Sequence, residues 1–236
     1  MTIDKSEARV RQMFGEIAGR YDFLNHLLSL NIDRYWRWRT IRAVPPPSDG
    51  PILDLCTGTG DLALAYHRAS GGQAKIIGAD FCHPMLVLGD AKRRVAGCNG
   101  QLTFVEADAQ RLPFPDDFFS ICCVAFGLRN VTDTDRGLRE MTRVCRAGGK
   151  VVVLEFSLPA WRPLRTTYLA YFRHVLPRIG QALARNRHAA YNYLPATVGE
   201  FPAGEALAER MRQAGLAEVT FRPLTFGVAT LYVGTK

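Results

Sequence analysis

A single turn near residue 58 constrains the fold of this chain more than any other feature. An apolar run at 51–56 is followed by Gly58 and Gly60 and then by a helix-forming stretch, and Asp80 ends the next apolar run at 74–80. Glycine lets the backbone turn sharply and approach a ligand, and a carboxylate at the end of the neighbouring strand can accept both hydroxyls of a ribose. The segment therefore predicts the strand, nucleotide-binding turn and helix of an α/β sheet.

The turn alone leaves the nucleotide open. Gly58-x-Gly60-x-x-Ala63 also satisfies the dinucleotide fingerprint, so a nicotinamide or flavin enzyme is an alternative. Asp54 lies inside the first strand, where its carboxylate could attract a cationic sulfonium, orient the glycine loop, or simply be a buried acid bonded to loop amides. Asp108 follows the third strand and could accept a hydrogen bond from an adenine amino group or cap a helix. The two acids favour a sulfonium cofactor.

Apolar runs alternate with helical stretches along most of the chain. This order predicts an α/β fold with a seven-stranded, mostly parallel sheet and an antiparallel edge, because alternating strands and helices form parallel sheets. In such sheets the ligand lies beyond the carboxyl ends of the strands, where the strand order reverses. The expected strands are 51–56, 74–80, 102–107, 119–125, 149–156, 216–223 and 227–233, with a helix at about 204–214 before the last two.

Two segments outside this alternation are candidates to cover the site. Apolar residues at helical spacing predict an amphipathic helix over 6–21 and a second helical stretch, which the prolines at 45–47 end. Residues 1–47 are therefore expected to form a helical N-terminal cap. The proline-punctuated, aromatic and basic stretch at 157–202 is expected to form a helical insertion on the substrate side. We expect a single domain spanning 1–236.

Composition limits the partners and the compartment. The net charge of +8 suits a polyanion such as RNA or an anionic membrane surface, and many arginines gather among aromatic residues at 162–187. No apolar signal opens the chain and no run approaches eighteen apolar residues, so we expect a cytoplasmic protein, at the inner face of the membrane, that is neither exported nor membrane-spanning. The six cysteines lack C-x-x-C spacing, which predicts reduced thiols and no metal site.

Five short strings in the chain are more specific than the glycine turn alone. They are Tyr-Asp-Phe-Leu-Asn at 21–25, Leu-x-x-Gly-Thr-Gly-Asp at 55–61, Phe-Gly-Leu-Arg-Asn-Val-Thr at 126–132, Leu-Glu-Phe at 154–156 and His-Val-Leu-Pro-Arg-Ile-Gly at 174–180. Together they resemble the C-methyltransferases of menaquinone and ubiquinone biosynthesis, which are class I S-adenosylmethionine-dependent enzymes with a Rossmann-like fold. The resemblance runs from about Val10 to the C-terminus, and its most specific part is the string at 126–132.

The resemblance implies a cofactor, a substrate and a set of contacts. The cofactor would be S-adenosylmethionine, and the acceptor a prenylated quinol, with demethylmenaquinol favoured over a ubiquinone precursor by Tyr-x-Tyr-Leu-Pro at 191–195 and Glu-Phe-Pro at 200–202. Ubiquinone-type members often have a serine where this chain has alanine at 125. The expected cofactor-binding residues, some from the turn itself and some from the resemblance, are Asp54, Gly58, Thr59, Gly60, Asp80, Asp108, Ala109 and Ala125.

Methyl transfer to a ring carbon requires electron density from a ring oxygen, so the protein must accept the phenolic proton or stabilise the phenolate. Arg129 is the expected electrostatic stabiliser, although it could instead pair with Asp133 or Asp135. Asp61 could hold the methionine moiety or act as a base through water. Tyr21 could close the site from the end of the first helix.

Two further residues have weaker support. Asp22 follows Tyr21 and could also close the site or be a surface acid. His174 is a conventional base by residue type, but a lone histidine in an apolar helix is more often part of the core.

Other functions are disfavoured at the site. An RNA methyltransferase would show an Asn/Asp-Pro-Pro-aromatic or Pro-Cys string in place of residues 126–129. A nicotinamide oxidoreductase is supported by the glycine spacing alone. A non-catalytic cofactor-binding protein would keep the same motifs. The expected partners are thus the prenylated quinol and an anionic membrane surface rather than a nucleic acid, and a homo-oligomer is left open.

Overall fold

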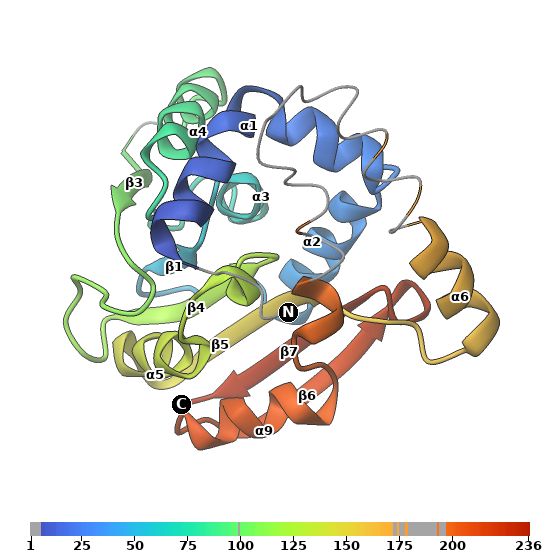
Figure 1. Cartoon of the computed structure of the whole chain (residues 1–236). Helices are drawn as coiled ribbons and strands as arrows, with labels where there is room; N and C mark the ends of the chain where they lie inside the picture. The colour runs from blue at the N-terminus through green and yellow to red at the C-terminus, as the bar shows by residue number, and fades with distance from the viewer. Residues whose placement is uncertain (1–5, 99, 172–173, 175–177, 179–192, 194–196) are drawn as a thin grey trace.

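The computed structural model describes residues 6–98, 100–171, 174, 178, 193 and 197–236. They form one seven-stranded sheet, in the order β3-β2-β1-β4-β5-β7-β6, with helices on both faces (Figure 1). The strands are β1 (Ile52–Leu55), β2 (Ile76–Asp80), β3 (Leu102–Glu106), β4 (Phe119–Ala125), β5 (Cys145–Phe156), β6 (Ala217–Leu224) and β7 (Ala229–Thr235). The helices are α1 (Glu7–Leu28), α2 (Ile32–Ala43), α3 (Asp61–Ala69), α4 (His83–Val95), α5 (Thr134–Val144), α6 (Arg162–Ala170) and α9 (Glu205–Gln213), with short 3-10 turns η1 (Leu128–Asn130) and η3 (Thr225–Gly227).

The pairing confirms the expected fold class. Strands β1 to β5 are parallel, while β7 is antiparallel to both β5 and β6, so the β6–β7 pair forms the antiparallel edge. The sequence underestimates one strand, because β5 begins at Cys145 rather than at 149. The winding reverses between β1 and β4, which places the switch point at the carboxyl ends of these two strands.

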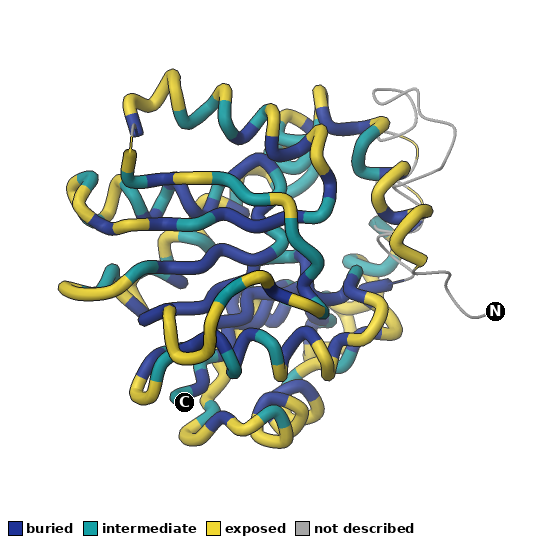
Figure 2. Tube along the Cα trace, turned by 90° about the vertical axis from the view of Figure 1, so that its left-hand side faces the viewer, coloured by how far each residue is buried: buried dark blue, intermediate teal, exposed yellow. Residues whose placement is uncertain are grey.

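Alternating residues of the sheet supply two separate cores. In β5, Val151 and Val153 pack with residues of α5 and α9, whereas Val152 and Leu154 pack with Trp36 of α2 and with residues of α3. This is the period of two expected for a strand that is covered on both faces. The buried strands therefore run between two helical layers (Figure 2).

The first N-terminal helix is longer than the sequence predicts, and the two N-terminal helices lie against different parts of the fold. Helix α1 continues to Leu28 instead of ending near Tyr21, and its Ala18 packs against Met85 of α4. Helix α2 packs on the sheet through Trp36, whose indole Nε1 donates a 2.7 Å hydrogen bond to Thr225 of η3. The first and last parts of the chain are thus joined beside the same sheet.

The segment at 157–202 is described only in part. Helix α6 has no buried residue, and most of the basic stretch at 162–187 lies outside the described residues, as does most of the Tyr-x-Tyr-Leu-Pro string. All six cysteines are free thiols. Among the helices that the structure describes, none combines the length and apolar character that a bilayer crossing requires.

Candidate functional site

The glycine turn adopts a backbone that only glycine accommodates well. Gly58 and Gly60 have φ of +58° and +82°, in the left-handed region. A Cβ on Gly60 would also lie 2.6 Å from the ring of Phe104, so both backbone strain and the neighbouring side chain exclude a larger residue. The turn leads directly into α3, whose first residue is Asp61.

Asp54, in the strand before the turn, holds the shape of this turn through hydrogen bonds. Its Oδ2 accepts hydrogen bonds from the Thr57 hydroxyl at 2.6 Å and from the Ala63 amide at 3.1 Å, which ties β1 to the turn and to α3. Burial raises the pKa of Asp54 to about 7, although these two hydrogen bonds act in the opposite direction. The geometry favours the loop-orienting role considered for this residue, because its carboxylate contacts the turn.

Asp80 holds the other side of the turn. Its two carboxylate oxygens accept the amide protons of Gly58 at 2.8 Å and Cys82 at 2.9 Å. The side chain is buried, and burial raises its pKa. The backbone of Phe81 also donates to this carboxylate, which has four lone pairs in all and can therefore still accept from a ribose hydroxyl.

A cavity of about 60 Å³ lies beside Asp80 at the ends of the strands. Asp108 and Ala109 line it together with Gly58 and Ala125. The Asp108 carboxylate accepts the Gln110 amide at 2.9 Å and so caps a tight turn. No helix starts there, so the alternative role of helix cap is wrong, because the chain turns into an isolated bridge between Asp108 and Arg111.

The residues of this smaller cavity fit the adenosine half of S-adenosylmethionine. Asn130, which the sequence analysis did not single out, lines the same cavity, and its buried Oδ1 has no hydrogen-bond partner among the described residues. A buried carbonyl oxygen of this kind is costly unless a donor reaches it. Asn130 could therefore accept from a bound ligand, as Asp80 could from a ribose and Asp108 from an adenine.

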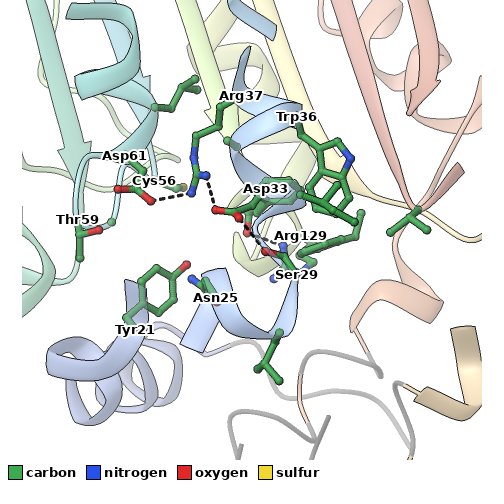
Figure 3. Close-up of a pocket in the computed structure, with 18 of the residues that line it drawn as sticks. Tyr21, Asn25, Ser29, Asp33, Trp36, Arg37, Cys56, Thr59, Asp61 and Arg129 are labelled. Carbon is green, nitrogen blue, oxygen red and sulfur yellow. Dashed lines mark hydrogen bonds and ion pairs between the residues drawn. The ribbon is translucent and has the colours of Figure 1, made fainter. Parts of the chain in front are cut away.

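A larger cavity of about 330 Å³ lies on the other side of the turn (Figure 3). Tyr21, Gly58 and Ala125 line both cavities, so the two spaces meet at the glycine turn. Most of the wall is apolar and aromatic, with a small group of charged side chains. The aromatic wall residues are Phe14, Tyr21, Trp36, Phe126, Phe156, Tyr168, Tyr171 and Tyr193, and the charged ones are Asp33, Arg37, Asp54, Asp61 and Arg129.

Asp61 is held by two cations that the sequence analysis did not identify. Arg37 of α2 donates to its Oδ2 at 2.7 Å and Lys92 of α4 to its Oδ1, and Arg37 also pairs with Asp33. Burial would raise the pKa of Asp61, but Arg37 and Lys92 prevail and lower it. A carboxylate with a lowered pKa is a weak base, so the geometry favours a holding role over proton abstraction.

Thr59 is part of the same group of side chains. Its hydroxyl donates to Asp22 of α1, and Lys92 contacts both residues. The spacing of Asp33 and Arg37, four residues apart on one helix, was the only sequence signal for this network.

Arg129 is buried in η1, at the end of β4, and its partner differs from the expected ones. Its Nη1 pairs with Glu155 of β5 at 2.6 Å and also donates to the carbonyl oxygen of Phe126. The expected pairing with Asp133 or Asp135 is wrong, because η1 turns the side chain back toward the sheet, while Asp133 caps α5. The guanidinium carbon lies 5.2 Å from the ring centroid of Phe156.

Tyr21 and His174 also differ from their expected surroundings. Tyr21 lies inside α1 rather than at its end, and its ring is 3.8 Å from where a Cβ on Gly58 would be. Burial raises the pKa of the Tyr21 hydroxyl. His174 is exposed, so it is not a core residue, and it is not among the residues that line either cavity.

The sequence as a whole matches one family model. The match to the ubiE/COQ5 methyltransferase family extends over residues 2–236. A ubiquinone/menaquinone biosynthesis C-methyltransferase from Geobacter sp. (strain M21) is 44% identical over 97% of this chain and 96% of its own length. A demethylmenaquinone methyltransferase from Bacteroides fragilis is 41% identical over 98% of this chain and 94% of its own length.

Solved structures agree on the fold. An S-adenosylmethionine-dependent methyltransferase from Thermotoga maritima superposes with a TM-score of 0.67 at 17% identity, covering 95% of this chain and 98% of that protein. The Haemonchus contortus phosphoethanolamine N-methyltransferase 2, solved with S-adenosyl-L-methionine, gives a TM-score of 0.60 at 14% identity, covering 85% of this chain and 52% of that one. The fold is therefore that of class I methyltransferases.

We predict that Asp80→Asn weakens S-adenosylmethionine binding by roughly 10- to 100-fold, because hydrogen bonds to a charged group contribute about 1.5–3 kcal/mol. The amide oxygen of asparagine can still accept one backbone proton, so the turn should persist. Isothermal titration calorimetry would give the dissociation constant. Asp90→Asn is the matched control, since among the described residues Asp90 pairs with Arg93 and Arg94 on α4 and lines neither cavity; equal affinities for the two variants would contradict the assignment.

Proposed function

Because the chain belongs to the ubiE/COQ5 methyltransferase family and methylates a ring carbon in quinone biosynthesis at the expense of S-adenosylmethionine, we propose that its preferred acceptor is demethylmenaquinol. The acceptor ring would occupy the larger cavity, and the adenosine half of the cofactor the smaller one. In this proposal the chain works as a single domain in which 1–47 and 157–202 enclose the acceptor.

The shape and lining of the larger cavity support an aromatic acceptor. Trp36, Phe126 and Phe156 pack against one another with centroid separations of 4.5–5.8 Å and form an apolar wall for a fused ring. Tyr193 belongs to the Tyr-x-Tyr-Leu-Pro string that favours the menaquinone branch, and it lines this cavity. The Bacteroides fragilis relative, named a demethylmenaquinone methyltransferase, also supports the naphthoquinol.

The single observation that carries the mechanism is the buried arginine in the cavity wall. When bound, S-adenosylmethionine supplies an electrophilic methyl group. The ring carbon becomes nucleophilic when a hydroxyl group elsewhere on the ring loses its proton, and a guanidinium held in a largely apolar cavity would stabilise the resulting phenolate. Arg129 is held in place by Glu155 and Phe156, so it would need little reorganisation to do so.

The function is tested by incubating the purified protein with methyl-labelled S-adenosylmethionine and either a reduced demethylnaphthoquinol or a demethylated benzoquinol. We expect label in both lipids, with kcat/KM at least tenfold higher for the naphthoquinol. A preference for the benzoquinol would overturn the menaquinone assignment. Transfer to neither quinol, with cofactor binding intact, would overturn the quinol as acceptor.

We predict that Arg129→Lys lowers kcat by about 100-fold while cofactor affinity stays within twofold, because loss of one preorganised donor typically costs 10²–10³ in rate. Lysine keeps a positive charge beside the buried Glu155 but loses the planar fork. Steady-state kinetics with the preferred quinol provides the measurement. The matched control is Arg143→Lys, which alters an arginine that pairs with Glu140 and Asp116 outside both cavities; an equal loss there would argue for a general structural effect.

We also propose that the protein contacts an anionic membrane surface to reach its prenylated substrate. Tyr168 and Tyr171, at the end of α6, line the larger cavity, and the Tyr171 hydroxyl donates to the carbonyl of Leu28 at 2.9 Å. The exposed Trp161, Arg162 and Arg165 stand at the start of the same helix. An aromatic side chain with neighbouring cations suits the headgroup region beside a cavity mouth.

Vesicle co-sedimentation at low salt tests this contact. Reversing two charges, in Arg162→Glu with Arg165→Glu, should reduce binding to anionic vesicles about tenfold or more, since each basic residue near such a surface contributes about 1 kcal/mol. Arg136→Glu with Arg139→Glu makes the same charge change on the exposed face of α5 and should have a smaller effect. Equally weak binding of the parent protein to anionic and neutral vesicles would exclude the proposal.

A further inference from the structure

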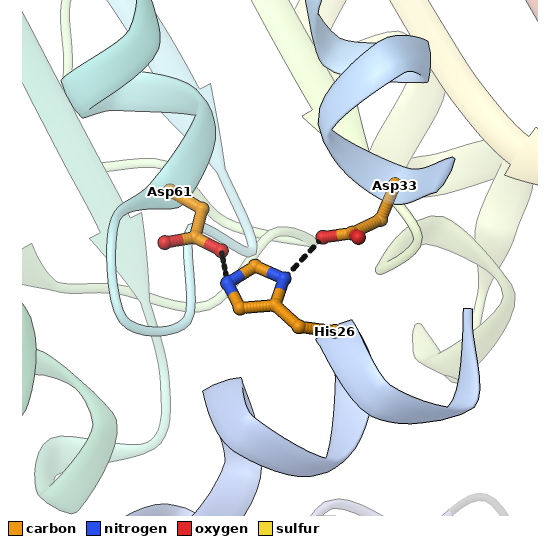
Figure 4. A group of neighbouring side chains, drawn as sticks. All are labelled: His26, Asp33 and Asp61. Atoms are coloured by element: carbon orange, nitrogen blue, oxygen red, sulfur yellow. Dashed lines mark hydrogen bonds and ion pairs between the residues drawn. The ribbon is translucent and has the colours of Figure 1, made fainter. Parts of the chain in front are cut away.

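His26 lies between two carboxylates, Asp33 and Asp61 (Figure 4). It belongs to the last turn of α1, while Asp33 comes from α2 and Asp61 from α3. Its Nδ1 is 2.7 Å from Asp33 Oδ2, and its Nε2 is 3.9 Å from Asp61 Oδ2. Both carboxylates line the cavity wall.

The contacts of Asp33 determine which ring nitrogen carries the proton. The Asp33 side chain is only 5% exposed, and it accepts hydrogen bonds from the Ser29 hydroxyl at 2.7 Å and from Arg37 as well as facing His26 Nδ1. A carboxylate that already accepts from two donors has no proton to give, so Nδ1 must be the donor. In the neutral ring Nε2 then has a free lone pair.

The lone pair on Nε2 faces a second acceptor. A separation of 3.9 Å is too long for a direct hydrogen bond, and two acceptors would repel each other there. A single water molecule could satisfy both acceptors, because it can donate one of its hydrogens to His26 Nε2 and the other to Asp61 Oδ2. Because Asp61 lines the larger cavity, a hydroxyl group of a ligand bound there could pass its proton to this water.

His26 borders a network of ion pairs. Its bonded network contains three carboxylates, Asp22, Asp33 and Asp61, and two permanent cations, Arg37 and Lys92, which leaves one net negative charge when His26 is neutral. A proton on His26 would bring this network to neutrality.

The same cations argue against a metal ion at His26, Asp33 and Asp61, although the three side chains lie close enough to offer ligand atoms. Arg37 bridges the carboxylates of Asp33 and Asp61, and Lys92 contacts the other oxygen of Asp61, Oδ1. A divalent cation would have to displace both.

We propose that His26 accepts the phenolic proton of the acceptor through one water molecule, with Asp33 as the positioning residue that fixes its tautomer. This inference rests on the function proposed above. Arg129, in the wall of the larger cavity, then stabilises the phenolate while His26 holds the proton.

The proton and electron balance closes within the site. The hydroxyl proton passes through the water to Nε2, and the electron pair that it leaves on oxygen enters the ring. The ring carbon uses a pair to bond the methyl carbon, as the bond from that carbon to sulfur breaks and leaves its pair on sulfur. Loss of the hydrogen on the methylated carbon restores the aromatic ring, and the proton held by His26 can return to the oxygen, so one proton is released overall.

The tautomer can be measured without turnover. Nitrogen-15 NMR of the full-length protein, with the His26 signal assigned by its loss in His26→Gln, should show a protonated Nδ1 and an unprotonated Nε2 in the neutral ring. A proton on Nε2 would overturn the proposal whether or not the quinol assignment is correct.

Kinetics supplies the second test, with the quinol that the parent protein methylates. We expect His26→Gln to lower kcat by 10²–10³-fold, within the usual contribution of a general base, with KM and cofactor affinity within twofold. The remaining rate should rise about tenfold per pH unit, because hydroxide must replace the base. Asp33→Asn should lower kcat by at least tenfold.

His83→Gln is the matched control, because His83 makes the same Nδ1-to-carboxylate contact with Glu106 on the exposed surface of α4. It should retain the parent's kcat and pH profile. A kcat for His26→Gln within threefold of the parent, or an unchanged pH profile, would refute the role. Failure of the parent to methylate either quinol would instead count against the proposed function, and the NMR experiment would still decide the tautomer.

Discussion

Two buried carboxylates determine the geometry on which the rest of the site depends. Asp54 binds Thr57 and Ala63, and Asp80 binds Gly58 and the start of α4. Burying a carboxylate is costly unless it is hydrogen-bonded, so the turn and its two acids stabilise each other only in one arrangement. That arrangement sets the direction in which α3 leaves the sheet, and with it the position of Asp61 in the wall of the larger cavity.

The sheet and the glycine turn could be predicted because local patterns determine them. Strand β5 alternates between two cores, and Gly60 must lack a side chain because Phe104 lies against it. The partner of Arg129 could not be predicted in this way. Glu155 is 26 residues away, and only the pairing of β4 with β5 brings it close, whereas Asp133 looked nearer along the chain.

The charged network shows a second limit of sequence reasoning. Thr59 and Asp61 were expected to contact cofactor or substrate, and in the structure they also fasten α1, α2 and α4 to the glycine turn through Asp22, Arg37 and Lys92. These residues come from four helices and one turn. Ion-pair partners that are far apart in the sequence leave no periodic pattern in it, so only the tertiary fold reveals that these residues converge.

The position of β7 in the sheet means that the sheet can be completed only late in synthesis of the chain. It is the last strand of the chain, yet it lies between β5 and β6 and so must fill a central position. Until it emerges from the ribosome, β5 has an unpaired edge and β6 has no sheet to join, and Trp36 lacks its partner Thr225 for nearly as long. An open strand edge invites pairing with other chains, so a nascent polypeptide that stalls before this strand is the form most in need of a chaperone.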